Sequence, residues 1–388
     1  MGAFSLIFTD FFIIFVSNTM KRGFKILLGS FCAFCILIIV SLSLEIFLRA
    51  KGKYPVNGQV YDNATLWKTR PNMASQSKSE EFGAFALETD NYGFRNMHKV
   101  YTPDKSKLRI LVIGDSYTAA LYLPYERMFT YLLEKGLENT TAVNKSIEVY
   151  NMASPGWGVE QQYQCLIKYG LQIKPDYVFI MTCPNDIREA YCKKYAQLKD
   201  GHLDFNQPPF SKSQLLRWKL SNYSNFYQYL QHSWFHTDYG SVDYLMTKMR
   251  FNFGKEDTTD WDRPLFMKHP IREVTEAWNL YFVTALKMKE SCDLLHVKIS
   301  FSCIPVLSEF DGSMQRDTLL TPGIVAAKID SFCRAQHMDY VDLHTPFTMD
   351  TTPRNLFRSN GDFHWNSRGA SLAAEVLKRY YLTELTKQ

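Results

Sequence analysis

The sequence predicts an α/β protein with three layers, in which helices cover both faces of a mainly parallel, five-stranded sheet. Three features support this prediction. Short apolar runs recur from residue 108 onward, and segments with helical spacing of apolar residues separate them. The runs are continuously apolar, as strands buried on both faces of a parallel sheet are. Parallel neighbours need long crossover connections, and the intervening helical segments supply them.

The individual elements follow from apolar spacing and from the Pro and Gly residues between them. Five segments have the length and composition of buried strands: 108–113, 147–151, 177–182, 297–302 and 340–343. Helices are expected from Pro124 to Gly136, from Tyr163 to Gly170, over 272–291, over 324–336 and after Asn366. Asn366 suits the N-cap of the last helix, because its side chain can accept hydrogen bonds from free backbone N–H groups.

The amino-terminal region contains an apolar run over residues 24–48, about as long as a helix needs to cross a bilayer. Lys21, Arg22 and Lys25 lie at its start, so the positive-inside rule keeps the N-terminus in the cytoplasm and exports the remainder. A cleaved signal peptide is the alternative, but no A-x-A-like cleavage site is evident. We therefore expect a single-pass membrane anchor.

This reading divides the chain into four parts. Residues 1–23 are a cytoplasmic segment, or lie upstream of a true start at Met20, and residues 24–48 are the anchor. Residues 49–105 are a polar juxtamembrane segment that packs on the domain, and residues 106–388 are the main domain. Residues 187–271 are an aromatic-rich insertion, too long for an ordinary connection and expected to be helical. The insertion either covers one side of the site or packs only against the core or near the membrane.

Composition excludes some partners. The formal net charge of +5 is small for 388 residues, and Lys and Arg alternate with Asp and Glu without a long basic run. This pattern is not that of a nucleic-acid-binding surface. The eight cysteines lack the spacing of a zinc site. We expect no nucleic acid, metal or organic cofactor.

Polar residues follow the predicted strands at the points where each strand ends. Ser116 follows the first strand, Gly156 the second and Asn185 the third, while Asp362 and His364 lie in the loop before the last helix. Function in such sheets gathers at the carboxyl ends of the strands. We therefore expect these five residues to lie close together.

These residue types suit nucleophilic catalysis. A serine hydroxyl is a poor nucleophile until a base takes its proton, and that base is usually a histidine oriented by a carboxylate. The oxyanion that develops needs donors already aimed at it. Taken alone, the Gly-Asp-Ser at 114–116 is equally a strand-to-helix turn with a polar cap. The ordered combination with the later residues favours a nucleophile.

Four short blocks carry a family resemblance: GDS (114–116), NMASPG (151–156), PND (184–186) and DFHWN (362–366). Together they resemble the SGNH, or GDSL-type, hydrolase family, and look closest to its membrane-anchored bacterial branch. The resemblance implies a serine-dependent hydrolase of carboxylic esters or acetylated glycans. It implies that Ser116 is the nucleophile, His364 the base and Asp362 the acid. It also implies an oxyanion hole formed by the Ser116 N–H, the Gly156 N–H and the Asn185 amide.

Two departures from the family pattern keep alternatives open. The family commonly has Asp-x-x-His, whereas this chain has Asp362-Phe-His364, a spacing similar to that of polysaccharide O-acetyltransferase relatives. The resemblance therefore also allows O-acetyl transfer onto an envelope polysaccharide. Asp342 is a weaker candidate for the acid, and Gly158 is the second candidate for the glycine donor. A non-catalytic envelope binding protein that keeps the fold is the third alternative.

Overall fold

The computed structural model describes residues 22–51, 58–97, 101–104, 106–138, 140, 145–206, 211–231, 233, 262–359 and 361–387. Most of the predicted segment 1–23, and with it the choice between Met1 and Met20 as the start, lies outside the described residues. The chain divides into two compact units. One comprises Met1–Val56 and Arg217–Gly240, and the other Asn57–Leu216 and Ser241–Gln388.

The larger unit is built on the predicted five-stranded sheet. Its strands, in chain order, are β5 (Lys107–Gly114), β6 (Ser146–Ala153), β7 (Tyr177–Thr182), β10 (Lys298–Cys303) and β11 (Asp339–Tyr340). They run parallel in the order β11-β10-β7-β5-β6, which confirms the predicted fold class. The last strand is shorter than the predicted 340–343, because pairing to β10 ends at Tyr340.

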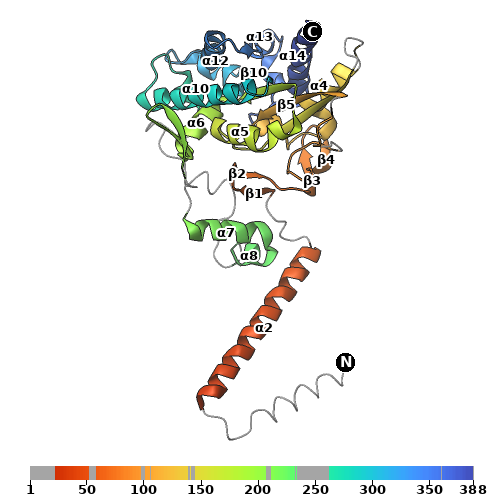
Figure 1. Cartoon of the computed structure of the whole chain (residues 1–388), viewed down its shortest axis with the longest axis vertical. Helices are drawn as coiled ribbons and strands as arrows, with labels where there is room; N and C mark the ends of the chain where they lie inside the picture. Colours follow the sequence, from red (N-terminus) through yellow and green to blue (C-terminus); the bar gives the residue numbers. More distant parts are fainter. Residues whose placement is uncertain are drawn as a thin grey trace. The chain divides into compact units, whose positions relative to one another are not determined.

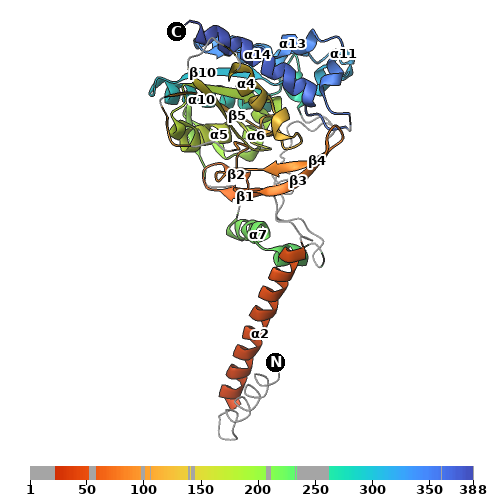
Figure 2. The same ribbon diagram turned by 90° about the vertical axis from the view of Figure 1, so that its right-hand side faces the viewer.

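Helices cover both faces of this sheet (Figures 1 and 2). α5 and α10 pack together on one face, with α12 beside α10 through the stacked rings of Phe282 and Phe332. α4 and α14 pack together on the other face. The bounds are α3 (Ser116–Ala119), α4 (Phe129–Glu138), α5 (Val159–Cys165), α6 (Pro184–Lys193), α10 (Arg272–Asp293), α11 (Ser313–Arg316), α12 (Ile324–Ala335), α13 (His344–Thr348) and α14 (Ser367–Leu385).

The strand order places a change of chain direction at β5. The chain passes from β5 to β6 on one side, and then crosses back to β7 on the other side. Helices on the two sides of such a reversal leave the sheet on opposite faces, which opens a crevice at the carboxyl ends of the strands. The residues that follow β5, β6 and β7 therefore lie side by side at the carboxyl edge of the sheet.

Two predicted helix ends differ from the structure. α4 continues through Gly136 to Glu138, because a glycine ends a helix only where the backbone turns left-handed, and Gly136 stays helical. After α5 the chain winds as a π-helix over Leu166–Gly170 and then as a 3-10 helix over Leu171–Ile173. Asn366 caps α14 as predicted, since its side chain accepts from the N–H groups of Arg368 and Gly369.

Three short antiparallel hairpins were not predicted. They are β1 (Gln59–Asp62) with β2 (Leu66–Thr69), β3 (Ala74–Ser79) with β4 (Gly83–Glu88), and β8 (Ala196–Lys199) with β9 (His202–Phe205). The first is joined to the β6–α5 loop by two indole hydrogen bonds, from Trp67 Nε1 to the Pro155 carbonyl (3.0 Å) and from Trp157 Nε1 to the Trp67 carbonyl (2.7 Å). This part of the segment 49–105 is therefore fixed to the sheet-bearing unit.

The smaller unit contains α2 (Arg22–Lys51), together with α8 (Asn225–Leu230) and the end of α7 (Lys212–Tyr223). Within it, α2 is long and apolar enough to cross a membrane from Gly23 to Lys51. Near its carboxyl end, the Glu45 carboxylate accepts hydrogen bonds from Ser224 Oγ and from the N–H groups of Asn225 and Phe226. Within the aromatic-rich insertion, α8 and the residue before it thus pack on α2.

Candidate active site

Ser116 lies at the first position of α3, immediately beyond the carboxyl end of β5. Asp115 is the N-cap of this helix and accepts a hydrogen bond from the Tyr117 N–H at 3.0 Å. A Cβ on Gly114 would lie 2.2 Å from Thr118 Oγ1, so only glycine allows the strand to turn this tightly into the helix. The turn presents the Ser116 side chain at the edge of the sheet.

The burial of side chains shows that the loops after β5, β6 and β7 are open to solvent at Ser116, Gly156 and Asn185. In the stretch 108–120 every residue is buried except Ser116, and in the stretch 177–190 every residue is buried except Asn185. In the stretch 147–162 the exceptions are Pro155 and Gly156. Because β5 lies between β6 and β7, these openings occur side by side at one edge of the sheet.

His364 reaches Ser116 from the loop before α14. Its Nε2 lies 2.7 Å from Ser116 Oγ, and its Nδ1 lies 2.5 Å from Asp362 Oδ1. A carboxylate can only accept, so Nδ1 carries the proton and Nε2 accepts from the serine hydroxyl. A hydroxyl, an imidazole and a carboxylate joined in this order can activate a serine oxygen for attack.

The loop that carries His364 is held on both sides. The Phe363 carbonyl accepts from Tyr117 Oη at 2.7 Å, and the His364 carbonyl accepts from the Arg358 N–H at 2.9 Å. Trp365 is buried, and its Nε1 donates to the Pro305 carbonyl at 3.1 Å. Trp365 therefore packs the loop into the core.

Arg358 extends the hydrogen-bonded chain beyond the carboxylate, and sequence reasoning missed it. Its Nη1 donates to Asp362 Oδ2, and its guanidinium lies over the Tyr122 ring, 5.3 Å from the centroid. Burial alone raises the pKa of Asp362, but the hydrogen bonds from His364 and the Arg358 charge outweigh it and lower that pKa to about 2. Asp362 is therefore ionised at neutral pH.

Asn185 lies in the first turn of α6, next to the buried carboxylates of Asp115 and Asp186. Burial raises the pKa of Asp115, while His364, the Tyr117 N–H and the Asn185 side chain act in the opposite direction. Asp186 accepts from the Cys183 N–H at 2.8 Å and from Gln162 Nε2 at 2.7 Å. These contacts fix the loop after β7, so that Asn185 is its open residue.

The two glycine candidates differ in what their N–H groups do. The Gly158 N–H already donates to Gln161 Oε1 at 3.1 Å, and a Cβ there would lie 2.8 Å from the Ala190 nitrogen. Gly158 thus allows α5 and α6 to approach closely. Gly156 instead adopts a φ of 75° at the open part of the loop, a conformation that favours glycine. Of the two glycines, Gly156 is therefore the one at the open part of the loop.

Asp342, the weaker candidate for the acid, does not contact His364. It is exposed and accepts from the Thr345 N–H at 3.0 Å, at the start of α13. Among the residues that the structure describes, no group of His, Cys, Asp and Glu side chains is arranged to hold a metal ion.

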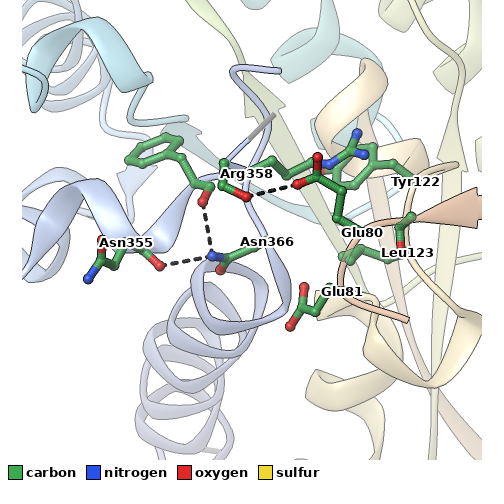
Figure 3. A pocket seen from close by; sticks show the side chains of 10 residues that line it. Glu80, Glu81, Tyr122, Leu123, Asn355, Arg358 and Asn366 are labelled. Carbon is green, nitrogen blue, oxygen red and sulfur yellow. Dashed lines mark hydrogen bonds between the residues drawn. The ribbon is translucent and has the colours of Figure 1, made fainter. Parts of the chain in front are cut away.

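A cavity of about 420 Å³ lies beside this hydrogen-bonded chain (Figure 3). We call it the hairpin cavity, because the turn between β3 and β4 forms one wall. The lining residues are Ser79, Glu80, Glu81, Tyr122, Leu123, Asn355, Phe357, Arg358, Ser359 and Asn366. The Tyr122 ring joins the cavity to the site, since its centroid lies 4.7 Å from that of His364.

No protein-family model matches the chain. No curated protein matches it either. Among solved structures, it is similar to a lipase/acylhydrolase from Enterococcus faecalis, with 14% identity, a TM-score of 0.40 and coverage of 71% of this chain and 96% of that one.

Two further solved structures are similar to it. An α/β hydrolase from the metagenome of Lake Arreo, Spain, has 13% identity, a TM-score of 0.41 and coverage of 74% and 99%. A catalytic mutant of an acetylxylan esterase from Geobacillus stearothermophilus has 15% identity, a TM-score of 0.39 and coverage of 72% and 95%. The function proposed below rests on the geometry of the site in this chain.

Proposed function

We propose that this protein is a serine-dependent hydrolase of carboxylic esters. His364 Nε2 takes the proton from Ser116 Oγ as that oxygen attacks the ester carbonyl carbon. Asp362 fixes the tautomer and stabilises the imidazolium that forms. The imidazolium then protonates the departing alcohol, which leaves an acyl group on Ser116. Water, activated by His364, attacks this acyl-enzyme, and the carboxylic acid departs.

Three donors hold the oxyanion of each tetrahedral intermediate in this mechanism: the Ser116 N–H, the Gly156 N–H and the Asn185 amide. The strand order supports this assignment, because β6 and β7 flank β5 on its two sides. The Gly158 N–H is occupied, which supports Gly156. Donors fixed before the reaction stabilise developing charge without reorganisation, and each one contributes on the order of 10²–10³ in rate.

The observation that carries the proposal is the chain of contacts from Ser116 Oγ through His364 to Asp362, at 2.7 and 2.5 Å. It joins residues 248 positions apart at the carboxyl edge of a parallel sheet. A helix cap or a turn would not require this contact. Its presence favours a catalytic role over a non-catalytic binding protein.

Turnover of acetyl esters tests the proposal. The purified full chain in detergent is expected to hydrolyse 4-nitrophenyl acetate, and Ser116→Ala to lose at least about 10³-fold in kcat. Ser106→Ala is the matched control, because Ser106 is exposed near the opposite end of β5 and bonds only locally, to Asp104. Equal activity of Ser116→Ala and wild type would overturn the assignment.

Acyl transfer to a sugar hydroxyl of an envelope polysaccharide is the second candidate, and the polar cavity beside His364 favours it. The chemistry is shared up to the acyl-enzyme, and only the acceptor differs. Product analysis separates the two: a hydrolase releases free acetate at the same rate with or without a saccharide acceptor. Acceptor-dependent formation of acetylated saccharide would instead identify a transferase.

We also propose that residues 24–48 anchor the protein as a single span, with the N-terminus in the cytoplasm and the catalytic unit outside it. The outward-facing apolar side chains of α2 support this, with Leu37 64% and Ile46 69% exposed. The basic residues at its start, Arg22 and Lys25, support the orientation.

A further inference from the structure

The hairpin cavity lies on the histidine side of the site. It shares Arg358 with the hydrogen-bonded chain, and Tyr122 lies between the cavity and the His364 ring. Neither Gly156 nor Asn185 is among its lining residues. Ser116 and His364 do not line it either, so the Tyr122 ring separates the cavity from the imidazole, and the cavity lies away from the proposed oxyanion donors.

Position relative to the histidine determines which half of an ester the cavity receives. In serine acyl transfer, the imidazolium gives its proton to the leaving oxygen, so the alcohol half departs on the histidine side. In this step the bond from Ser116 Oγ to the acyl carbon forms, and the bond from that carbon to the alcohol oxygen breaks. The serine proton passes through His364 Nε2 to the alcohol oxygen. A cavity beside His364 thus receives the alcohol.

The lining is suited to hydroxyl groups. The carboxylates of Glu80 and Glu81 are at the cavity wall, and Tyr122 adds an aromatic ring (Figure 3). Ser359 Oγ donates to Glu80 Oε2 at 2.8 Å, which holds this carboxylate and leaves its other oxygen able to accept. Ligand pockets have volumes of about 300–1,000 Å³, and this cavity lies in that range.

The charge of the lining discriminates between kinds of alcohol. Arg358 is paired with Asp362, so its charge is balanced within the site. Glu80 and Glu81 then leave the cavity with excess negative charge, because they accept hydrogen bonds from Ser359 and Ser367, which are neutral groups. An anionic alcohol such as a uronate would be repelled.

We propose that the hairpin cavity binds the alcohol half of the ester, and that this half is a neutral, hydroxyl-rich glycosyl unit. The inference rests on the proposed hydrolase function and adds the substrate class to it. Glu80 accepts from sugar hydroxyls, and the excess negative charge selects against uronic acids.

Direct binding tests the inference without any turnover. Full-length Ser116→Ala protein in detergent is titrated by saturation-transfer NMR with neutral methyl glycosides (glucoside, galactoside, mannoside and xyloside) and with methyl glucuronide. At least one neutral glycoside is expected to bind, and adding Glu80→Ala is expected to weaken it about tenfold. Adding Glu80→Gln is expected to raise the affinity for the glucuronide relative to the neutral glycoside.

Glu88→Gln is the matched control, since Glu88 is exposed at the other end of the same hairpin, opposite Ala74. It is expected to bind the same ligands as the parent protein. Thermal melting of each variant verifies that the fold is retained. If none of the four neutral glycosides binds, or if Glu80→Ala binds them as tightly as the parent, the inference is wrong.

Kinetics with otherwise wild-type protein separate this inference from the proposed function. The ratio of kcat/KM for acetylated methyl glycoside to that for 4-nitrophenyl acetate is expected to fall about tenfold in Glu80→Ala, mainly through KM. Ester turnover with an unchanged ratio would overturn the inference and leave the hydrolase proposal standing. Glu80-dependent glycoside binding without any ester turnover would do the reverse.

Discussion

The spacing Asp362-Phe-His364 brings two donors of one histidine to a single carboxylate oxygen. Asp362 Oδ1 accepts from the His364 backbone N–H at 3.0 Å and lies 2.5 Å from His364 Nδ1. The chain makes this tight turn at Phe363, whose carbonyl is held by Tyr117. The short spacing therefore does not separate the acid from the base. It orients the imidazole through the backbone as well as through the side chain.

Asp362→Asn is expected to lower kcat for 4-nitrophenyl acetate by about 10³–10⁴. An asparagine amide can donate to Nδ1, which would place the proton on Nε2, where it cannot accept from Ser116. Asp342→Asn is the matched control, because Asp342 is exposed and contacts only the start of α13. If Asp362→Asn retains wild-type kcat, the acid has been assigned to the wrong residue.

The same carboxylate also predicts a pH dependence of stability. The folded-state pKa of Asp362 is lowered from 3.8 to about 2, so the charged form stabilises the folded protein by about 2 kcal/mol. This contribution is complete above the unfolded pKa and disappears as pH falls through the folded pKa. Urea unfolding should show the difference between wild type and Asp362→Asn narrowing between pH 4 and about 2. A constant difference over this window would contradict the predicted ionisation.

At the scale of elements, the sheet was predictable because its strands are buried on both faces. β5 and β7 are apolar nearly throughout, and such runs can be recognised as strands from the sequence without knowing which strands pair with them. The hairpin of β3 and β4 was not predictable, because most of its side chains are exposed and lack apolar alternation. Three candidate residues, Ser116, Gly156 and Asn185, were identified by their positions after strands, and Asp362 and His364 by their place in the loop before the last helix. Arg358 could not be found in this way, because only the folded loop brings it to Asp362.

The β5–α3 turn explains why glycine precedes the Asp-Ser pair. In Gly114→Ala, the new Cβ would lie 2.2 Å from Thr118 Oγ1 and 3.1 Å from Met181 Cβ. We expect destabilisation of about 1–3 kcal/mol and a lower kcat, since Ser116 would move with α3. Adding Thr118→Ala removes the nearer atom and should restore part of both losses.

Gly136→Ala provides the control for this prediction. Gly136 lies within α4, and its closest neighbour is Lys378 Cδ at 3.0 Å, in a flexible side chain that can move away. The free energy of unfolding of Gly136→Ala should equal or exceed that of the wild type, because alanine is a better helix former than glycine. The steric account of the turn would be wrong if Gly114→Ala and Gly136→Ala showed equal stability and activity.

At the scale of the whole molecule, the two units have different surfaces. The sheet-bearing unit buries most of its large apolar side chains, whereas α2 exposes Leu37, Ile46 and most of its other apolar residues. α8 covers part of α2 near the carboxyl end of α2, where Glu45 accepts hydrogen bonds from Ser224 and Phe226. An apolar helix of this length that is not covered by protein is suited to a bilayer.

Fractionation of cells that express the full chain tests the anchor. The protein should sediment with membranes, resist extraction by alkaline carbonate and dissolve in detergent, with residues 24–48 still present by mass. Protease added outside the cytoplasmic membrane should digest the catalytic unit. Recovery of a soluble chain that lacks residues 24–48 would instead indicate a cleaved signal peptide.

Covalent labelling tests the central claim most directly, because it requires an activated serine but no knowledge of the substrate. A fluorophosphonate probe should modify the full-length protein at one site, and peptide mapping should place the adduct on Ser116. Ser106→Ala should label like wild type, and Ser116→Ala should not label. If Ser116→Ala labels as strongly as wild type, Ser116 is not the nucleophile and the proposed mechanism is wrong.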